Sequence, residues 1–171
     1  MYWFTADEHY GHVNIIEHCQ RPFMNVKEMD QYLIDTHNEV VEKRDTVVHV
    51  GDFCWKDVNY ATPIIKALNG NHIFVCGSHD RWLKKVKDRY GYVYIRHLTI
   101  EKQVVIACHY AMRVWPQSHH GSWQVYGHSH GCLEPVGNQY DVGVDNNYFY
   151  PVSFEELSSI IRRNNETIGQ D

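Results

Sequence analysis

Runs of β-forming residues end in short clusters of aspartate and histidine at five places along this chain. The runs cover residues 2–5, 46–50, 73–76, 104–108 and 124–126, and each is typical of a strand. The clusters are Asp7-Glu8-His9, Gly51-Asp52, Gly77-Ser78-His79-Asp80, His109 and Gly127-His128-Ser129-His130. Because the ends of neighbouring strands meet at one edge of a sheet, we expect these side chains to build a single site. Carboxylates combined with imidazoles are ligands for transition metals rather than for calcium.

The length of 171 residues and a hydrophobic fraction of 43% predict a single domain over residues 1–171. The residues from about 164 to 171 are polar, and we expect them to form a frayed tail. The five cysteines include no C-x-x-C pair, which argues against a disulfide framework or a zinc ribbon. We interpret three of them as small buried residues near the strands: Cys54, Cys76 and Cys108.

The sequence contains no apolar run long enough to span a bilayer, and Met1 leads directly into the first motif without a signal peptide. We therefore expect a cytoplasmic protein that does not bind membranes. A net charge of −5, without a block of lysine and arginine, does not favour a large nucleic-acid-binding surface. A small anionic phosphate ester is compatible with this charge, and the oligomeric state stays open.

Helical periodicity and turn signals divide the first 90 residues into alternating strands and helices. We expect strands at residues 2–6, 46–50 and 73–76, and helices at 13–19, 26–41, 59–68 and 81–89. Later residues predict successive strands at 93–100, 103–108, 123–126 and 140–144. A final helix is capped by Ser153 and ends near Arg162. This order predicts an α/β protein in which two sheets pack face to face with helices outside.

The spacing within the clusters favours shared metal coordination. Asp7 and His9 are two residues apart, as are His128 and His130, and side chains at this spacing share a face of an extended segment. Asp52 leaves a buried strand after a glycine, so its two oxygens can bridge two cations. Taken alone, each fragment is more often a turn, a chance pairing or a buried histidine. Their order and their place at strand ends together indicate one site.

The combined pattern D-x-H, G-D, G-N-H-D/E, H and G-H-x-H resembles that of the calcineurin-like metallophosphoesterases. Residues 3–16, 19–23 and 142–145, followed by Pro151-Val152-Ser153, resemble a compact branch of this family found in bacteria and phages. The resemblance covers nearly the whole chain. It implies a four-layer αββα sandwich of two mixed sheets flanked by helices.

The resemblance also implies which residues bind which ion. The first metal would be held by Asp7, His9, Asp52 and His130, and the second by Asp52, Ser78, His109 and His128. His79 would lie over the substrate phosphoryl group, and Asp80 would orient its imidazole. Mixed nitrogen and oxygen ligands suit two divalent transition metal ions, with manganese expected and iron, zinc, nickel or cobalt as alternatives.

Position 78 departs from the family pattern, which usually has asparagine where this chain has Ser78. A hydroxyl is shorter than an amide and is a poorer neutral ligand, so we expect the second ion to bind weakly. Gly70-Asn71-His72 mimics the motif, but it precedes the strand at residues 73–76. We therefore expect its side chains at the opposite edge of the sheet.

The expected reaction is hydrolysis of a small phosphodiester, cyclic nucleotide-like esters included. A hydroxide that bridges both ions would attack phosphorus, and His79 would act as the general acid. The alternatives are a nuclease acting on DNA or RNA, a phosphomonoesterase, and a metal-binding module with weakened turnover. The substitution at Ser78 is the feature that supports the last of these.

Residues outside the motifs are secondary candidates. His12 either approaches the substrate or caps a short helix. In the segment between the last two motifs, Arg113 is a candidate for gripping phosphate and Trp115 for stacking on a base, unless this segment is an ordinary solvated loop. Arg21 and Arg81 are further candidates for contacting the substrate. Trp55 is interpreted as core or rim packing. Three acids are candidates for supporting the ligands from behind: Glu8, Asp80 and Asp145.

Overall fold

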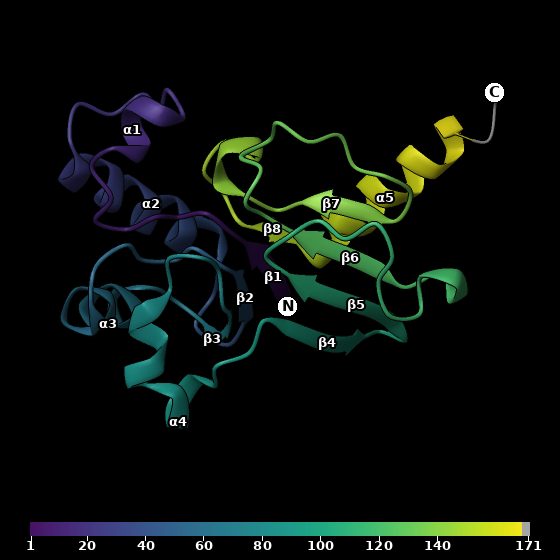
Figure 1. Cartoon of the computed structure of the whole chain (residues 1–171), viewed down its shortest axis with the longest axis horizontal. Coiled ribbons are helices and arrows are strands. Elements are labelled where there is room, and N and C mark those ends of the chain that lie inside the picture. The colour runs from purple at the N-terminus through teal and green to yellow at the C-terminus, as the bar shows by residue number, and fades with distance from the viewer. Residues whose placement is uncertain (169–171) are drawn as a thin grey trace.

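Two four-stranded sheets form the centre of the structure, a computed structural model that describes residues 1–168 (Figure 1). The first sheet has the order β3-β2-β1-β8, in which β1 (Tyr2–Thr5), β2 (Thr46–Val50) and β3 (Asn71–Val75) are parallel and β8 (Val152–Ser153) is antiparallel. The second sheet has the order β4-β5-β6-β7. Its strands are β4 (Ile95–Ile100), β5 (Gln103–Cys108), β6 (Trp123–Tyr126) and β7 (Gln139–Asp141), and only the β4–β5 pair is antiparallel. Two mixed sheets confirm the predicted fold class.

The two sheets share one apolar core. Alternate residues of the first sheet, Phe4, Val48 and Val50, are fully buried there together with Val105 and Val125 of the second sheet. The final helix α5 (Phe154–Ile168) adds apolar side chains to the same core and contacts β1, β7 and β8. Burial of both sheets in one core fixes the positions of the loops that follow their strands.

Helices cover the other face of the first sheet. The helices α2 (Val26–Val40) and α3 (Val58–Ala67) pack in a second apolar cluster with the short 3-10 helix η1 (Arg81–Lys85). The short helices α1 (Ile15–His18) and α4 (Lys87–Tyr90) complete this side of the molecule (Figure 1).

The long helices begin at capping side chains. The side chains of Asn25 and Asp57 accept hydrogen bonds from first-turn N–H groups of α2 and α3. At α5, Ser153 Oγ accepts from the N–H of Glu156 at 3.1 Å, and the Glu156 carboxylate accepts from the N–H of Ser153 at 3.0 Å. The predicted cap at Ser153 is therefore confirmed.

Several element boundaries differ from the prediction. The expected helix at 13–19 shortens to α1, and the expected helix at 81–89 divides into η1 and α4. The expected strand at 140–144 ends at Asp141, and residues Val144–Asn146 form a 3-10 turn, η3. The strand β8 and the 3-10 turn η2 (Ser118–His120) have no counterpart in the sequence-based prediction.

The final helix α5 extends to Ile168 instead of ending near Arg162. Polar residues are compatible with the solvated face of a helix, so composition alone did not mark its end. Residues 169–171 of the expected tail lie outside the described residues. Within residues 1–168, no helix combines the length and the hydrophobicity that a membrane span requires. Cys54, Cys76 and Cys108 are buried, as predicted.

Candidate metal centre

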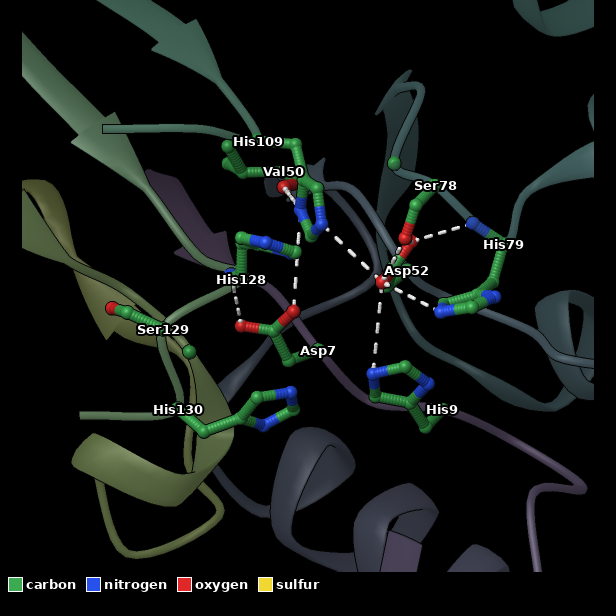
Figure 2. A network of polar contacts seen from close by, with 12 residues as sticks. Asp7, His9, Val50, Asp52, Ser78, His79, His109, His128, Ser129 and His130 are labelled. Atoms are coloured by element: carbon green, nitrogen blue, oxygen red, sulfur yellow. Dashed lines mark hydrogen bonds and ion pairs between the residues drawn. The ribbon is translucent and has the colours of Figure 1, made fainter. Parts of the chain in front are cut away.

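The predicted ligand clusters meet where parallel strands of both sheets end. Asp7 follows β1 and Asp52 follows β2, and the N–H of Asp7 donates to the carbonyl of Gly51 at 3.0 Å. In the second sheet, the N–H of Gly127 after β6 donates to the carbonyl of His109 after β5 at 3.1 Å. Figure 2 shows the side chains from both sheets pointing toward one another. The sequence order of the clusters therefore becomes one site in space.

Five of the seven predicted ligands have backbones in the left-handed region. Their φ angles lie between 47° and 69°: Asp7, His9, Asp52, His128 and His130. This conformation is unfavourable for residues other than glycine and costs on the order of 1–3 kcal/mol each, although aspartate and histidine tolerate it better than most. Strained backbones at five ligand positions show that the surrounding fold holds these side chains in fixed directions.

A first group of ligand atoms comes from Asp7, His9 and His130, whose donor atoms lie within 4.8 Å of one another. Asp7 is fully buried, and burial raises the pKa of its carboxyl group to about 7. Asp7 Oδ2 accepts a hydrogen bond from the N–H of His128 at 2.8 Å, whereas Oδ1 has no hydrogen-bond partner among the described residues. Buried His9 Nε2 is likewise without a partner among them.

A second group comes from Asp52, His109 and His128, again with donor atoms within 4.8 Å. His109 is fully buried and His128 is exposed at the surface. His109 Nδ1 lies 3.0 Å from the carbonyl oxygen of Val50, which leaves Nε2 directed toward the site. No described residue offers His109 Nε2 a well-formed hydrogen bond.

Asp52, a member of the second group, also faces the first. Its Oδ2 atom is 3.3 Å from His109 Nε2 and 3.7 Å from His9 Nε2, so one carboxylate faces ligands of both groups (Figure 2). Burial alone would raise the pKa of Asp52, but His109 and the N–H of His79 hold it well below its usual range. The bridging role of Asp52 stays a prediction, and this placement is compatible with it.

Ser78 and His79 approach the same carboxylate from the loop after β3. Ser78 Oγ donates to Asp52 Oδ2 at 3.0 Å, and His79 Nε2 lies 3.8 Å from that oxygen. The His79 side chain is 37% exposed, which makes it accessible from solvent. A side chain at Gly77 would collide with the carboxylate and the backbone nitrogen of Asp52, so this position requires glycine.

Asp80 does not pair with the His79 imidazole, contrary to our expectation. Its buried carboxylate instead accepts from the N–H groups of Asp52 at 2.7 Å and Gly77 at 2.9 Å, and from the indole of Trp82 at 2.9 Å. The N–H groups at these strand ends lack sheet partners, and Asp80 satisfies them. Asp80 therefore supports the loops that carry Asp52 and His79.

Arg21 and Asp145 support the first group, and Arg21 is buried instead of exposed as a phosphate-binding side chain would be. Arg21 donates to both carboxylate oxygens of Asp145, at 2.8 and 2.7 Å, and to the carbonyl of Asp7 at 2.7 Å. Asp145 Oδ2 in turn lies 2.7 Å from His130 Nδ1. Because the carboxylate holds Nδ1, the other ring nitrogen of His130 is free to bind a cation.

Other candidates are placed as follows. His12 lies at the site. Its Nδ1 atom is 3.4 Å from His9 Nδ1, and its ring stacks on Trp55. Arg113 lines a surface hollow formed with Trp115, Ser118, His119 and residues 136–138, none of which is a predicted ligand. Trp115 is buried, and its indole donates to the carbonyl of Ser122. Trp115 therefore packs inside the protein, and its ring is not available for stacking on a base.

Remaining candidates serve the fold. Glu8 pairs with His49 under the first sheet. Asn71 donates to the carbonyl of Asp45 before β2, so the look-alike motif lies at the opposite edge of the sheet, as predicted. Arg81 is exposed at the start of η1. No periodicity or spacing in the sequence marks Arg21 or Trp55 as part of the site.

The donor set fits divalent transition metal ions. An unpaired buried polar atom costs about 1–3 kcal/mol, and such atoms converge here from Asp7, His9 and His109. The opposite ring nitrogens of the histidines face fixed partners, namely His12 for His9, Val50 for His109 and Asp145 for His130. Imidazoles oriented in this way, together with carboxylates, suit manganese, iron, zinc, nickel or cobalt.

Comparison with known proteins adds the fold of a relative. No model of a known protein family matches the chain. An uncharacterized protein of Methanocaldococcus jannaschii is 26% identical over 172 residues, covering 94% of this chain and 91% of that protein. The crystal structure of a protein of unknown function from Aquifex aeolicus has a TM-score of 0.73 and 23% identity, covering 94% of this chain and 99% of that one. The latter likeness shows a shared fold.

An archaeal phosphodiesterase of known structure has a TM-score of 0.41 and 21% identity, over 83% of this chain and 81% of that one. A likeness of this size carries no argument about activity. The comparisons give no support to the compact bacterial and phage branch, which stays a prediction.

Proposed function

We propose that this protein is a binuclear metal-dependent phosphohydrolase of the metallophosphoesterase type, and a phosphodiesterase rather than a monoesterase. In this proposal Asp7, His9, Asp52 and His130 hold the first ion. Asp52, His109 and His128 hold the second ion, with Ser78 as a weak fourth ligand. The metal is manganese, and the substrates are small phosphodiesters, cyclic nucleotide-like esters included.

The observation that carries the proposal is that Asp52, a member of the second ligand group, also faces the unpaired His9 Nε2 of the first group. Its Oδ2 faces His9 Nε2 at 3.7 Å and His109 Nε2 at 3.3 Å. A carboxylate of one ligand group that also faces a ligand of the other is the arrangement that two adjacent cations require. When bound, two such ions lower the pKa of water and offset charge on phosphoryl oxygens.

His79 is the group proposed to protonate the leaving alkoxide. Its side chain is 37% exposed, and Nε2 lies 3.8 Å from the shared carboxylate, so a phosphoryl group at the site would be within reach. Its N–H donates to Asp52 Oδ1 at 2.8 Å, which fixes the backbone that carries the ring. An alkoxide leaving group needs a proton donor, and the proposal assigns this role to His79.

The test combines metal analysis with turnover. Protein purified in chelator and reloaded should bind about two manganese ions per chain and hydrolyse bis(p-nitrophenyl) phosphate. Chelator should abolish the hydrolysis, and added manganese should restore it. Failure to bind manganese, or turnover that persists in chelator, would contradict the proposal.

A metal-binding module with weakened turnover is the second candidate, and Ser78 is the observation that favours it. Its hydroxyl donates to Asp52 Oδ2 at 3.0 Å and so occupies the oxygen that the second ion needs. In this case the protein would bind one ion tightly and hydrolyse phosphodiesters slowly at any manganese concentration.

A further inference from the structure

An exposed tryptophan lies beside the candidate metal groups. Trp55 is three residues beyond Asp52, and its side chain remains 43% exposed. The indole stacks on the ring of His12, with centroids 3.9 Å apart and planes 5° apart. Its centroid also lies 4.5 Å from that of the His79 ring. A large apolar surface is therefore open to solvent next to the proposed proton donor.

The backbone holds this indole in a fixed position. The N–H of Trp55 donates to the carbonyl of Tyr10 at 3.1 Å, and Tyr10 and Cys54 form an isolated parallel bridge between the loops after β1 and β2. His12 covers one face of the indole, and His12 is itself held in place because it is only 9% exposed and contacts His9. The ring is therefore already ordered, and a ligand stacking on it would lose little conformational freedom on binding.

We propose that Trp55 is the stacking surface for a planar group of the substrate, a nucleobase or a similar ring. This inference rests on the proposed function, because the phosphoryl group must lie at Asp52 for the planar group to reach Trp55. The proximity of Trp55 to His79 places the planar group on the alcohol that departs. The substrate class is then a nucleoside phosphodiester instead of a simple alkyl diester.

A second exposed aromatic side chain provides the competing position. Tyr110 is also 43% exposed, and its ring contacts His128 at 4.7 Å and His109 at 5.0 Å between centroids. Tyr110 therefore contacts two members of the second ligand group, whereas the aromatic ring that contacts His79 is that of Trp55. A base held by Tyr110 would belong to the other arm of a diester.

The test uses two ligands that differ only in the base, adenosine 5′-monophosphate and ribose 5-phosphate. Calorimetry on the manganese-loaded protein should give roughly tenfold tighter binding of the nucleotide, as expected for one stacked base. Trp55→Ala should remove this difference while leaving the affinity for ribose 5-phosphate and the manganese content within about twofold. Trp55→Tyr, which keeps a planar face, should restore most of the difference.

Tyr148→Ala is the matched control, because Tyr148 is an 87% exposed aromatic side chain outside the candidate site. The inference is overturned if the wild-type protein binds both ligands equally or binds neither. It is also overturned if Trp55→Ala weakens both ligands alike, or if Tyr110→Ala alone removes the preference. Hydrolysis of bis(p-nitrophenyl) phosphate by the same preparation separates this failure from a failure of the proposed function.

Discussion

His109 Nε2 lies 3.3 Å from Asp52 Oδ2, and this contact joins the two sheets at the candidate metal centre. Burial alone would lower the pKa of His109, but the negative charge of Asp52 beside it raises the pKa to about 9. The histidine is therefore protonated in the metal-free protein, and its positive charge lies against the carboxylate. A cation that binds both residues must displace this proton, which couples metal affinity to pH.

Asp52→Asn should cost the protein both ions, because one carboxylate faces both ligand groups. The amide has nearly the same shape, so folding should be retained. We expect bound manganese to fall from about two ions per chain to below one, and phosphodiester turnover to fall at least a hundredfold. Metal analysis after dialysis measures the first quantity. Asp88→Asn, a change of an exposed acid on α4, should alter neither; full occupancy in Asp52→Asn would rule out the bridge.

His79→Ala should affect substrates according to their leaving groups. An alkoxide gains more from protonation than p-nitrophenolate does, so we expect a loss of about 10²–10⁴-fold for alkyl leaving groups and a much smaller loss for nitrophenyl esters. Because His79 is not among the predicted metal ligands, the manganese content should stay unchanged. Equal losses for both ester types would remove the acid role from His79.

The positions of the strands along the chain and the polar residues at strand ends could be predicted from the sequence because both signals are local. Asp52 and His109 each follow a short β-forming run in different sheets, and the face-to-face packing of the two sheets brings these strand ends together. The partner of Asp80 could not be predicted, since it depends on which N–H groups lose their sheet partners in the folded protein. Trp55 carried no signal because one aromatic residue in a loop has no periodicity.

Ser78→Asn should strengthen the second metal site. The serine hydroxyl donates to Asp52 Oδ2, whereas an asparagine amide offers an oxygen ligand in addition to a donor. Since Ser78 is exposed, the longer side chain can be accommodated. We expect the weaker of two manganese dissociation constants to fall about tenfold, as measured by titration with a metal-sensitive dye. An unchanged binding curve would show that position 78 does not contribute to the site.

Asp145→Asn should weaken the first metal site without removing a ligand. Asp145 orients His130 through Nδ1 and itself accepts hydrogen bonds from Nε and Nη2 of Arg21. Loss of a carboxylate behind a metal-binding histidine usually lowers metal affinity about 10- to 100-fold. The tighter manganese dissociation constant should rise by this factor. If only thermal stability falls and the manganese affinity is unchanged, Asp145 supports the fold and not the ion.

Arg21→Lys addresses the same contacts from the other side. Lysine cannot reproduce the bidentate contact with Asp145 together with the bond to the Asp7 carbonyl. Since the Arg21 side chain is fully buried and that of Asp145 is only 8% exposed, we expect a loss of about 3–5 kcal/mol in the free energy of unfolding. Urea denaturation of the metal-free protein measures this loss, and Arg44→Lys, a change at an exposed arginine, is the control.

His37 should make the metal-free protein sensitive to acid. Burial on α2 lowers the pKa of His37 from 6.5 to about 3, and the groups that face it are His49, His72 and the Asn69 carbonyl. The unfolded chain therefore binds a proton between pH 6.5 and 3 that the folded chain refuses. The contribution of His37 to the free energy of unfolding is fully present above pH 6.5 and declines as the pH falls toward 3.

At pH 5 the expected loss from His37 alone is roughly 2 kcal/mol relative to pH 7.5, before the contribution of its two histidine neighbours. His37→Gln keeps a donor for the Asn69 carbonyl but cannot gain a charge, so it should lose less stability over this interval. Urea midpoints in chelator at pH 7.5 and pH 5 measure both proteins free of metal effects. His119→Gln, at an exposed histidine on η2, should retain the wild-type loss because it leaves the buried histidines unchanged. Identical pH dependence of wild-type and His37→Gln would show that the buried ring is already protonated in the folded protein.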